Sequence, residues 1–324
     1  MELSRDVMAI DAEKISQQIE EFLRDRVRNF FKKRGIVIGL SGGIDSAVAG
    51  ALSVRALGPK RVHGVLLPER DSSPKSRAFG LLAAESLGIE YTEVEITPFL
   101  EGYGVYAKRD VIVKKYFPDL GDDYTFRLTL PQDLLDRDRI NAYHLDVQKA
   151  DGSVVSARLS PGDYLEMMAA NDIKQRTRMT VLYYEAERRN YIVCGTTNRA
   201  ETAQGFFVKY GDGGVDIEPL TPLYKNQVFA LGRYLDVPEE ILERMPSPDT
   251  YSFEVSDKDF YFCLPYDTVD MILYAQEHDV SKEDTAKALG LEMEQLERAW
   301  RDLDRKRGAT EHFRTMPPAP DLGI

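Results

Sequence analysis

Residues 35–47 decide the fold, and they read Gly35-Ile36-Val37-Ile38-Gly39-Leu40-Ser41-Gly42-Gly43-Ile44-Asp45-Ser46-Ala47. The first six residues are apolar without polar alternation, which is typical of a strand buried on both faces of a parallel sheet. A turn with two adjacent glycines follows, and the small residues after it predict a closely packed helix. The stretch therefore predicts a strand, a tight turn and a helix at the centre of the fold.

The alternation of strand and helix repeats outward from this stretch. Periodicity predicts further strands at 62–67, 89–96 and 191–195, and helices at 11–33, 74–87 and 161–189. Strands that alternate with helices indicate right-handed parallel crossovers. We therefore expect an α/β fold with a doubly wound, mostly parallel sheet flanked by helices, in which ligands bind at the carboxyl ends of the strands.

The alternation breaks between residues 100 and 160, where Pro, Gly and Asp are scattered. A possible hairpin, 144–147 with 154–159, surrounds the turn signal Asp151-Gly152. We interpret 100–160 as an insertion within a single domain that spans residues 1–324. The C-terminal part is predicted to be mainly helical, with an irregular segment at 246–265 and helices at 225–235, 239–244, 281–289 and 292–305.

Composition excludes several classes of function. The net charge of −12 argues against binding to nucleic acid or to a membrane surface, because a polyanion requires a concentrated basic face. Cys194 and Cys263 are too few for a disulfide scaffold and lack the spacing of a zinc site. The charged N-terminus has no apolar stretch that could form a signal peptide or a spanning helix. We expect a cytoplasmic protein.

The loop at 39–46 has the residues that a phosphate site requires. Glycines let backbone N–H groups approach an anion, Ser41 and Ser46 add hydroxyl donors, and the helix N-terminus contributes partial positive charge. Asp45 could hold Mg²⁺ against phosphate oxygens, since hard cations prefer carboxylates. The alternative is a glycine turn that only caps a helix. The loop lacks the Gly-Lys-Ser/Thr ending of a Walker loop, which disfavours a kinase that transfers the γ-phosphate.

The loop resembles the pyrophosphate-loop motif of the ATP pyrophosphatases, which have an adenine nucleotide alpha hydrolase-like fold. Three further segments indicate one family within that superfamily. In their order and spacing they are similar to segments of the NAD synthetase family. The three segments are 171–179, 195–201 and 205–216, and they read Asn-Asp-Ile-Lys-Gln-Arg-Thr-Arg-Met, Gly-Thr-Thr-Asn-Arg-Ala-Glu and Gly-Phe-Phe-Val-Lys-Tyr-Gly-Asp-Gly-Gly-Val-Asp. The resemblance covers residues 35–100 and 161–314.

Matched residue by residue, the resemblance implies a set of site residues. It implies Asp45 and Glu201 as Mg²⁺ ligands, and Asp45, Lys209 and Lys225 as catalytic residues. The implied ATP contacts are Gly39, Leu40, Ser41, Gly42, Gly43, Ile44, Asp45, Ser46, Thr196, Lys225 and Ser247. The implied contacts to deamido-NAD are Arg176, Lys209, Asp216, His312 and Phe313.

Some of these residues could instead have only a structural role. Arg176 could lie on a solvated helix face, Asp216 could be a turn residue, and Glu201 could merely cap the next helix. The sequence also departs from the family pattern at two positions. Ser247 stands where the family usually has threonine, and Phe313 stands where it usually has a basic residue.

The resemblance implies an ammonia-dependent enzyme that amidates deamido-NAD. Mg²⁺ is the cofactor, ATP the co-substrate, and NAD, AMP and pyrophosphate the products, formed through an adenylated carboxylate. A homodimer is implied, with ammonia either free or supplied by a separate glutaminase, because the chain has no room for the glutaminase domain of glutamine-using relatives. The alternatives are a related ligase that acts on a different carboxylate and a nucleotide-binding protein without catalysis.

Overall fold

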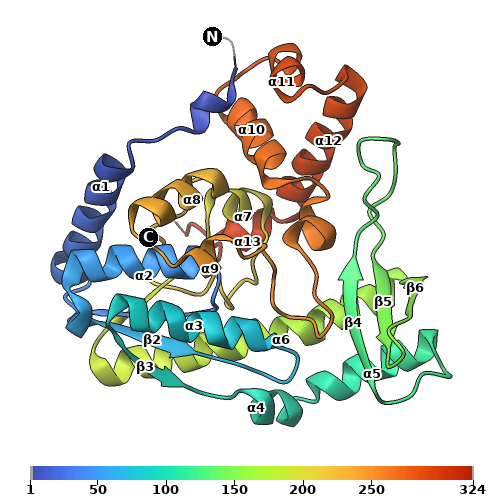
Figure 1. Ribbon diagram of the computed structural model, residues 1–324, viewed down its shortest axis with the longest axis horizontal. Coiled ribbons are helices and arrows are strands. Elements are labelled where there is room, and N and C mark those ends of the chain that lie inside the picture. Colours follow the sequence, from blue (N-terminus) through green and yellow to red (C-terminus); the bar gives the residue numbers. More distant parts are fainter. Residues whose placement is uncertain (1–2, 323–324) are drawn as a thin grey trace.

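The computed structural model describes residues 3–322 and contains a central sheet of four parallel strands in the order β3-β2-β1-β7 (Figure 1). The strands are β1 (Ile36–Gly39), β2 (Val62–Leu66), β3 (Glu90–Glu93) and β7 (Ile192–Cys194). The predicted doubly wound α/β fold is confirmed. The edge strand β3 is shorter than the 89–96 expected, although the Val94 and Ile96 N–H groups still donate to the Leu66 and Pro68 carbonyls beyond its end.

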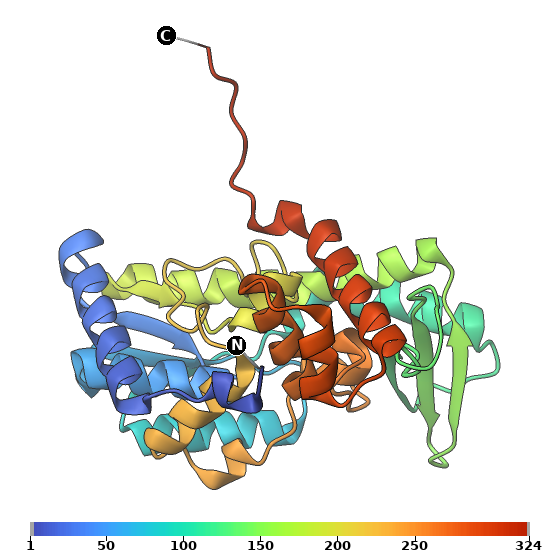
Figure 2. The ribbon, with the colours of Figure 1, turned by 90° about the horizontal axis from the view of Figure 1, so that it is seen from above.

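Both faces of the sheet are covered, as the apolar run of β1 predicts. Ile36 and Ile38 pack on one face against α1 (Ala12–Asp25), α2 (Ile44–Leu57), α3 (Pro74–Leu87) and α8 (Lys225–Tyr234). Val37 points to the other face, where it packs with Ala186 of α6 (Pro161–Arg189). Figure 2 shows α6 running along its side of the sheet. The alternation arises because successive side chains of a strand point to opposite faces.

The order of the strands creates one switch point. β1 pairs with β2 on one side and with β7 on the other, and both pairings are parallel. The chain therefore leaves β1 toward the β3 edge and returns on the opposite side at β7. The loops after β1 and β7 diverge at this point, and such a crevice at the carboxyl ends of the strands is where doubly wound sheets bind ligands.

The segment between β3 and α6 forms two helices and a second, separate sheet. It contains α4 (Thr97–Gly102), α5 (Val105–Tyr116) and an antiparallel sheet of β4 (Tyr124–Thr129), β5 (His144–Lys149) and β6 (Val154–Arg158). The predicted hairpin is confirmed, and Gly152 has the positive φ of its turn. Strand β4 was not predicted. This small sheet lies beside α5, away from the parallel sheet (Figure 1). The status of 100–160 as an insertion stays a prediction.

The C-terminal part is helical, as predicted. The helices beyond α6 are α7 (Arg199–Gln204), α8, α9 (Glu239–Leu242), α10 (Tyr266–Glu277), α11 (Lys282–Leu289), α12 (Met293–Ala309) and α13 (Glu311–Arg314). Short 3₁₀ turns form at Arg5–Met8 and Pro59–Arg61, and single π turns at Arg26–Phe30 and Lys258–Phe262. In residues 3–322 no helix combines the length and the apolar character needed to cross a membrane.

Replacement of Gly42 by alanine should destabilise the fold. Gly42 has φ +75°, and a Cβ there would lie 2.5 Å from the carbonyl oxygen of Ser76. The left-handed conformation alone costs an L-residue about 1–2 kcal/mol, so we expect Gly42→Ala to lose at least about 2 kcal/mol in urea denaturation. Gly162→Ala is the control, because nothing lies within 4 Å of its added Cβ. Equal stability of the two variants would contradict the assignment.

Candidate functional site

The loop after β1 presents an open helix N-terminus. Gly43 is the N-cap of α2, and no side chain of the described residues caps this end of the helix. The Ser46 hydroxyl donates to the Gly43 carbonyl at 2.9 Å, and the Ser41 and Ser46 hydroxyl oxygens lie 3.3 Å apart. Uncapped backbone N–H groups at a helix N-terminus carry partial positive charge. The loop is therefore shaped to receive an anion.

A cleft of about 800 Å³ opens at the carboxyl ends of the strands. This volume lies within the range of small-molecule and cofactor sites. The cleft brings together most of the residues that the sequence proposed: it is lined by Gly39, Leu40, Ser41, Gly43, Ile44, Asp45, Ser46, Thr196, Glu201, Lys225, Ser247 and Phe313. Gly42 lies behind this lining and packs against the start of α3.

A buried lysine joins two carboxylates in the cleft. The Lys225 ammonium at the start of α8 forms an ion pair with the Asp45 carboxylate at the start of α2. The same Nζ lies 3.8 Å from Oε1 of Glu201 on α7. Lys225 is only 2% exposed, and so the two carboxylates converge on one positive charge inside the protein.

Burial and charge shift the pKa values of this group. Burial, reinforced by the negative charge of Asp45, raises the pKa of Glu201 well above its usual range. Burial opposes the charged form of Lys225, but the carboxylates of Asp45 and Glu201 outweigh it and raise the pKa of the ammonium. One cation therefore serves two carboxylates, and additional positive charge would be favourable here.

The residues present fit a divalent cation only with help from a ligand. Among residues 3–322 no group of three or more Asp, Glu, His or Cys side chains is arranged to hold a metal ion. Asp45 and Glu201 supply two carboxylates that already converge on a positive charge. Mg²⁺ accepts one or two protein carboxylates together with water and phosphate oxygens. The donor set therefore suits Mg²⁺ that arrives with a nucleotide.

Asn198 belongs to the site, although the sequence alone did not indicate a role for it. Its side chain accepts from the Glu201 N–H, while Oε2 of Glu201 accepts from the Asn198 N–H, which forms a capping box at the start of α7. The Asn198 amide also donates to Oδ1 of Asp45 at 3.3 Å. Glu201 thus caps a helix with one oxygen and faces Lys225 with the other. The spacing Asn-x-x-Glu was the signal available in the sequence.

Asp257 and Arg244 were also missed, and both line the cleft. Asp257 is 4% exposed and accepts from the Tyr266 hydroxyl at 2.9 Å, while its Oδ1 has no hydrogen-bond partner among the described residues. Arg244 donates to the Ser41 carbonyl at 3.3 Å, which places a cation beside the phosphate loop. Both lie on or next to an irregular segment far from the loop in sequence, where no periodic pattern could point to them.

Four of the proposed acceptor contacts lie outside the lining of the cleft: Arg176, Lys209, Asp216 and His312. Asp172, Gln175 and Met179 of α6 line the cleft. Arg176 is exposed and lies outside the lining, although it pairs with Asp172, one turn earlier on the same side of the helix, at 3.8 Å.

Two of these residues form hydrogen bonds within the protein. The Lys209 ammonium donates to the His312 and Thr315 carbonyls at 2.7 and 3.2 Å. Asp216 accepts from the Val193 N–H at 2.8 Å and from the Tyr183 hydroxyl at 3.2 Å, which ties its loop to β7. Phe313 does reach the cleft, where its ring packs edge-on against Phe207 with centroids 5.9 Å apart. Lys209 and Asp216 thus each have hydrogen-bond partners that hold neighbouring segments of the chain together.

The fold and the site are those of an α/β protein that binds an anionic ligand at the carboxyl ends of its parallel strands. The model of the NAD synthase family matches residues 15–114 and 129–317. The match therefore extends into the 100–160 segment and leaves out only 115–128 of it. A relative described as NH(3)-dependent NAD(+) synthetase, from Rhizobium meliloti, is 42% identical over 314 residues, 97% of this chain and 93% of its own. The chain therefore belongs to the NAD synthase family.

Solved structures agree on the fold. The NMN synthetase of Francisella tularensis has a TM-score of 0.68 and 25% identity, and the comparison covers 97% of this chain and all of that one. An NH3-dependent NAD synthetase from Campylobacter jejuni has a TM-score of 0.63 with the same coverage. Its identity of 21% supports the fold alone.

The pKa of Asp257 makes a prediction for stability against pH. Burial raises this pKa from 3.8 to about 6, and the folded protein therefore binds the proton more tightly than the unfolded chain does. The contribution of Asp257 to wild-type stability should fall as pH rises from about 4 to 6, and the loss should then stay constant. Because asparagine does not titrate, Asp257→Asn should gain up to about 3 kcal/mol over the wild type across this window.

Urea denaturation between pH 3.5 and 8 measures this difference. We expect the two proteins to differ least at the acid end and most above pH 6. A difference that stays constant over the whole range would contradict the raised pKa.

Proposed function

We propose that this chain forms NAD by amidating deamido-NAD with ammonia, and that it cleaves ATP to AMP and pyrophosphate in doing so. The observation that carries the proposal is the Asp45, Lys225 and Glu201 group beside the open N-terminus of α2. The chain also belongs to a family in which similar relatives are described as NH(3)-dependent NAD(+) synthetases.

The phosphates of ATP bind at the loop after β1 in this proposal. The uncapped N–H groups of α2 and the hydroxyls of Ser41 and Ser46 bind phosphate oxygens. Lys225 adds a point charge and Arg244 a second cation beside the loop. The apolar end of β2, with Val65 and Leu66 in the lining, offers a surface for the base.

Asp45 and Glu201 would hold Mg²⁺ together with phosphate oxygens. The ion would supply charge neutralisation on the triphosphate, which makes pyrophosphate a better leaving group. Lys225 lies against both carboxylates in the described structure and would hold them together beside the phosphate loop.

The chemistry needs positioning and charge neutralisation rather than a side-chain nucleophile. A carboxylate oxygen of the acceptor attacks the α-phosphorus, the bond to the β-phosphate oxygen breaks, and pyrophosphate leaves. Ammonia then attacks the acyl carbon of the adenylate, AMP leaves with the electron pair, and the nitrogen loses a proton. Cys194 is no candidate nucleophile, because burial raises the pKa of its thiol to about 12. The site works by holding reactants in line.

In this proposal the acceptor contacts the aromatic part of the lining. Phe313 and Phe207 line the cleft with their rings packed edge-on, and the stacked rings of Tyr143 and Tyr164 line it from the 100–160 segment and from α6. Exposed Arg176 lies outside the cleft of one chain, and a homodimer with the acceptor near the subunit interface would give it a role. A cytoplasmic location and ammonia from solution or from a separate glutaminase complete the proposal.

The first test is a reconstitution with each component omitted in turn. Purified protein with Mg-ATP, ammonium and deamido-NAD should give NAD and AMP one to one, and only in the complete mixture, as measured by mass spectrometry. Asp45→Asn and Glu201→Gln should each lower kcat at least 100-fold, because each removes a carboxylate from the proposed Mg²⁺ set. Full turnover of folded variants at limiting Mg²⁺ would contradict the metal assignment.

The same assay identifies the acceptor. The carboxylate precursor of NMN is the informative competitor, because the similar structure from Francisella tularensis is described as an NMN synthetase. AMP formation with that acid and not with deamido-NAD would keep the chemistry and overturn the proposed acceptor.

Phe313 should affect the acceptor and not ATP. Phe313→Ala removes the ring that packs on Phe207 at the acceptor end, so we expect the KM for deamido-NAD to rise about tenfold while the KM for ATP stays within twofold. Phe313→Leu keeps apolar bulk and serves as the control. A rise in the KM for ATP alone would place the nucleotide at this end of the cleft.

A further inference from the structure

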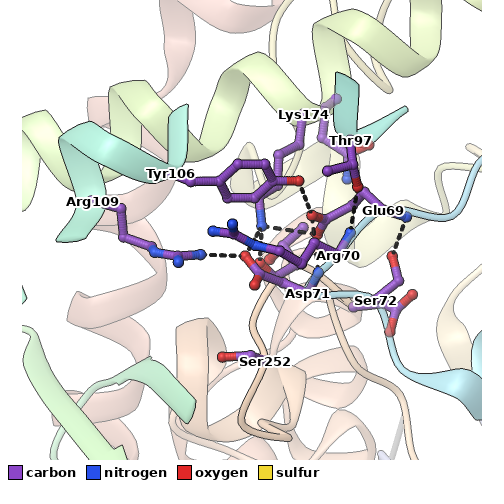
Figure 3. Close-up of polar contacts among 12 residues, drawn as sticks. Glu69, Arg70, Asp71, Ser72, Thr97, Tyr106, Arg109, Lys174 and Ser252 are labelled. Carbon is purple, nitrogen blue, oxygen red and sulfur yellow. Dashed lines mark hydrogen bonds and ion pairs between the residues drawn. The ribbon is translucent and has the colours of Figure 1, made fainter. Parts of the chain in front are cut away.

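A cluster of buried charges lies beside the cleft, and it consists of Glu69, Asp71, Tyr106, Arg109 and Lys174 (Figure 3). The four charged members are between 1% and 8% exposed. Glu69 and Asp71 follow β2, Tyr106 and Arg109 belong to α5, and Lys174 lies on α6. Two acids and two bases balance one another in this Lys174 cluster. The proposed mechanism uses none of them.

Lys174 uses all three of its donors inside the cluster. Its Nζ donates to Oε1 of Glu69 at 2.9 Å and to Oδ2 of Asp71 at 2.8 Å. The third bond, also 2.8 Å, goes to the backbone carbonyl of Thr250. A lysine ammonium has three donors and no acceptor, and so its hydrogen bonding is complete.

The helix α5 supports the same acids from the other side. The Arg109 guanidinium donates to Oδ2 of Asp71 at 2.5 Å, and the Tyr106 hydroxyl donates to Oε2 of Glu69 at 2.7 Å. The α5 helix belongs to the segment between β3 and α6. The Lys174 cluster therefore joins this segment to the loop that follows β2.

The two loops that Lys174 joins are both walls of the cleft. Leu67, Pro68 and Ser72 line it from the loop after β2, and residues 246–250 line it from the C-terminal part. Ser247, the proposed ATP contact, lies in the second loop. The Ser73 N–H also donates to Asp249 at 3.2 Å, which is a second link between the loops. The spacing of the two walls thus depends on a few polar contacts.

Stability alone does not account for a charged cluster at this place. Well-packed apolar residues in place of a buried ion pair are often as stable or more so. Hydrogen bonds to a carbonyl and to two carboxylates fix direction and distance, which apolar contacts do not. The arrangement therefore favours a role in setting the geometry of the loops.

We propose that Lys174 is a positioning residue for ATP: it holds the loop after β2 and the 246–250 loop at the spacing that the nucleotide requires. Through Arg109 and Tyr106 the α5 segment supports the same spacing. The inference rests on the proposed binding of ATP in this cleft and extends it to a residue that does not line the cleft.

The experiment measures the binding of Mg-ATP by calorimetry in the absence of acceptor. Lys174→Met should raise the Kd for Mg-ATP at least tenfold. The double variant Glu69→Gln/Lys174→Met should do the same, because it removes the link to Thr250 without leaving an unpaired buried charge. In steady-state assays the KM for ATP should rise in parallel, while kcat at saturating ATP and the KM for deamido-NAD stay within threefold. Hydrogen exchange should quicken in both loops together.

Glu185→Gln is the matched control. Glu185 is 3% exposed and pairs with Arg189, and neither residue lines the cleft. This variant should lose stability yet keep its Kd within twofold. A wild-type Kd in the double variant, or an equal rise in Glu185→Gln, would overturn the positioning role.

Two further outcomes are decided by the same measurements. If neither Lys174 variant folds, Tyr106→Phe decides, because it removes one hydroxyl and should raise the Kd about threefold; an unchanged Kd would overturn the proposal. A wild type that binds Mg-ATP but makes no NAD would refute the proposed reaction and leave this comparison valid. A wild type that does not bind Mg-ATP would overturn both.

Discussion

The Lys225 ammonium lies between two carboxylates, that of Asp45 on α2, which follows β1, and that of Glu201 on α7, which follows the neighbouring strand β7. Burial makes this group costly unless all its charges are paired, and the surrounding structure serves that pairing. Asn198 ties Asp45 to the start of α7. The parallel sheet brings these helix starts together because each follows a strand of the same direction at neighbouring positions.

The same constraint explains why the site is suited to a charged nucleotide. Burial raises the pKa of Glu201, and the negative charge of Asp45 adds to that effect, because one cation serves both carboxylates. In the proposed function, positive charge that arrives with a nucleotide would relieve this imbalance, while the open end of α2 would accept the negative charge of the phosphates.

The cleft has a second level of organisation around Lys174. The Lys225 group lines the cleft itself, whereas the Lys174 cluster contacts the loops that surround the cleft. In our proposals the first group takes part in the chemistry and the second sets the spacing of the loops. They lie on separate elements, α8 and α6, and the segment between β3 and α6 contributes only to the second. This division gives that segment a purpose at the site although it lies away from the parallel sheet.

Local periodicity and turn chemistry were enough to predict the strand, turn and helix at 35–47, the helix 161–189 and the hairpin at Asp151-Gly152. The sequence also pointed to Asp45, Glu201 and Lys225, through motifs that a family resemblance could read. Tertiary packing determined which residues of α6 line the cleft, and Arg176 is not among them. It alone brought in Asp257, Arg244 and the Lys174 cluster, because contacts between residues distant in the chain depend on packing and leave no periodic trace in the sequence.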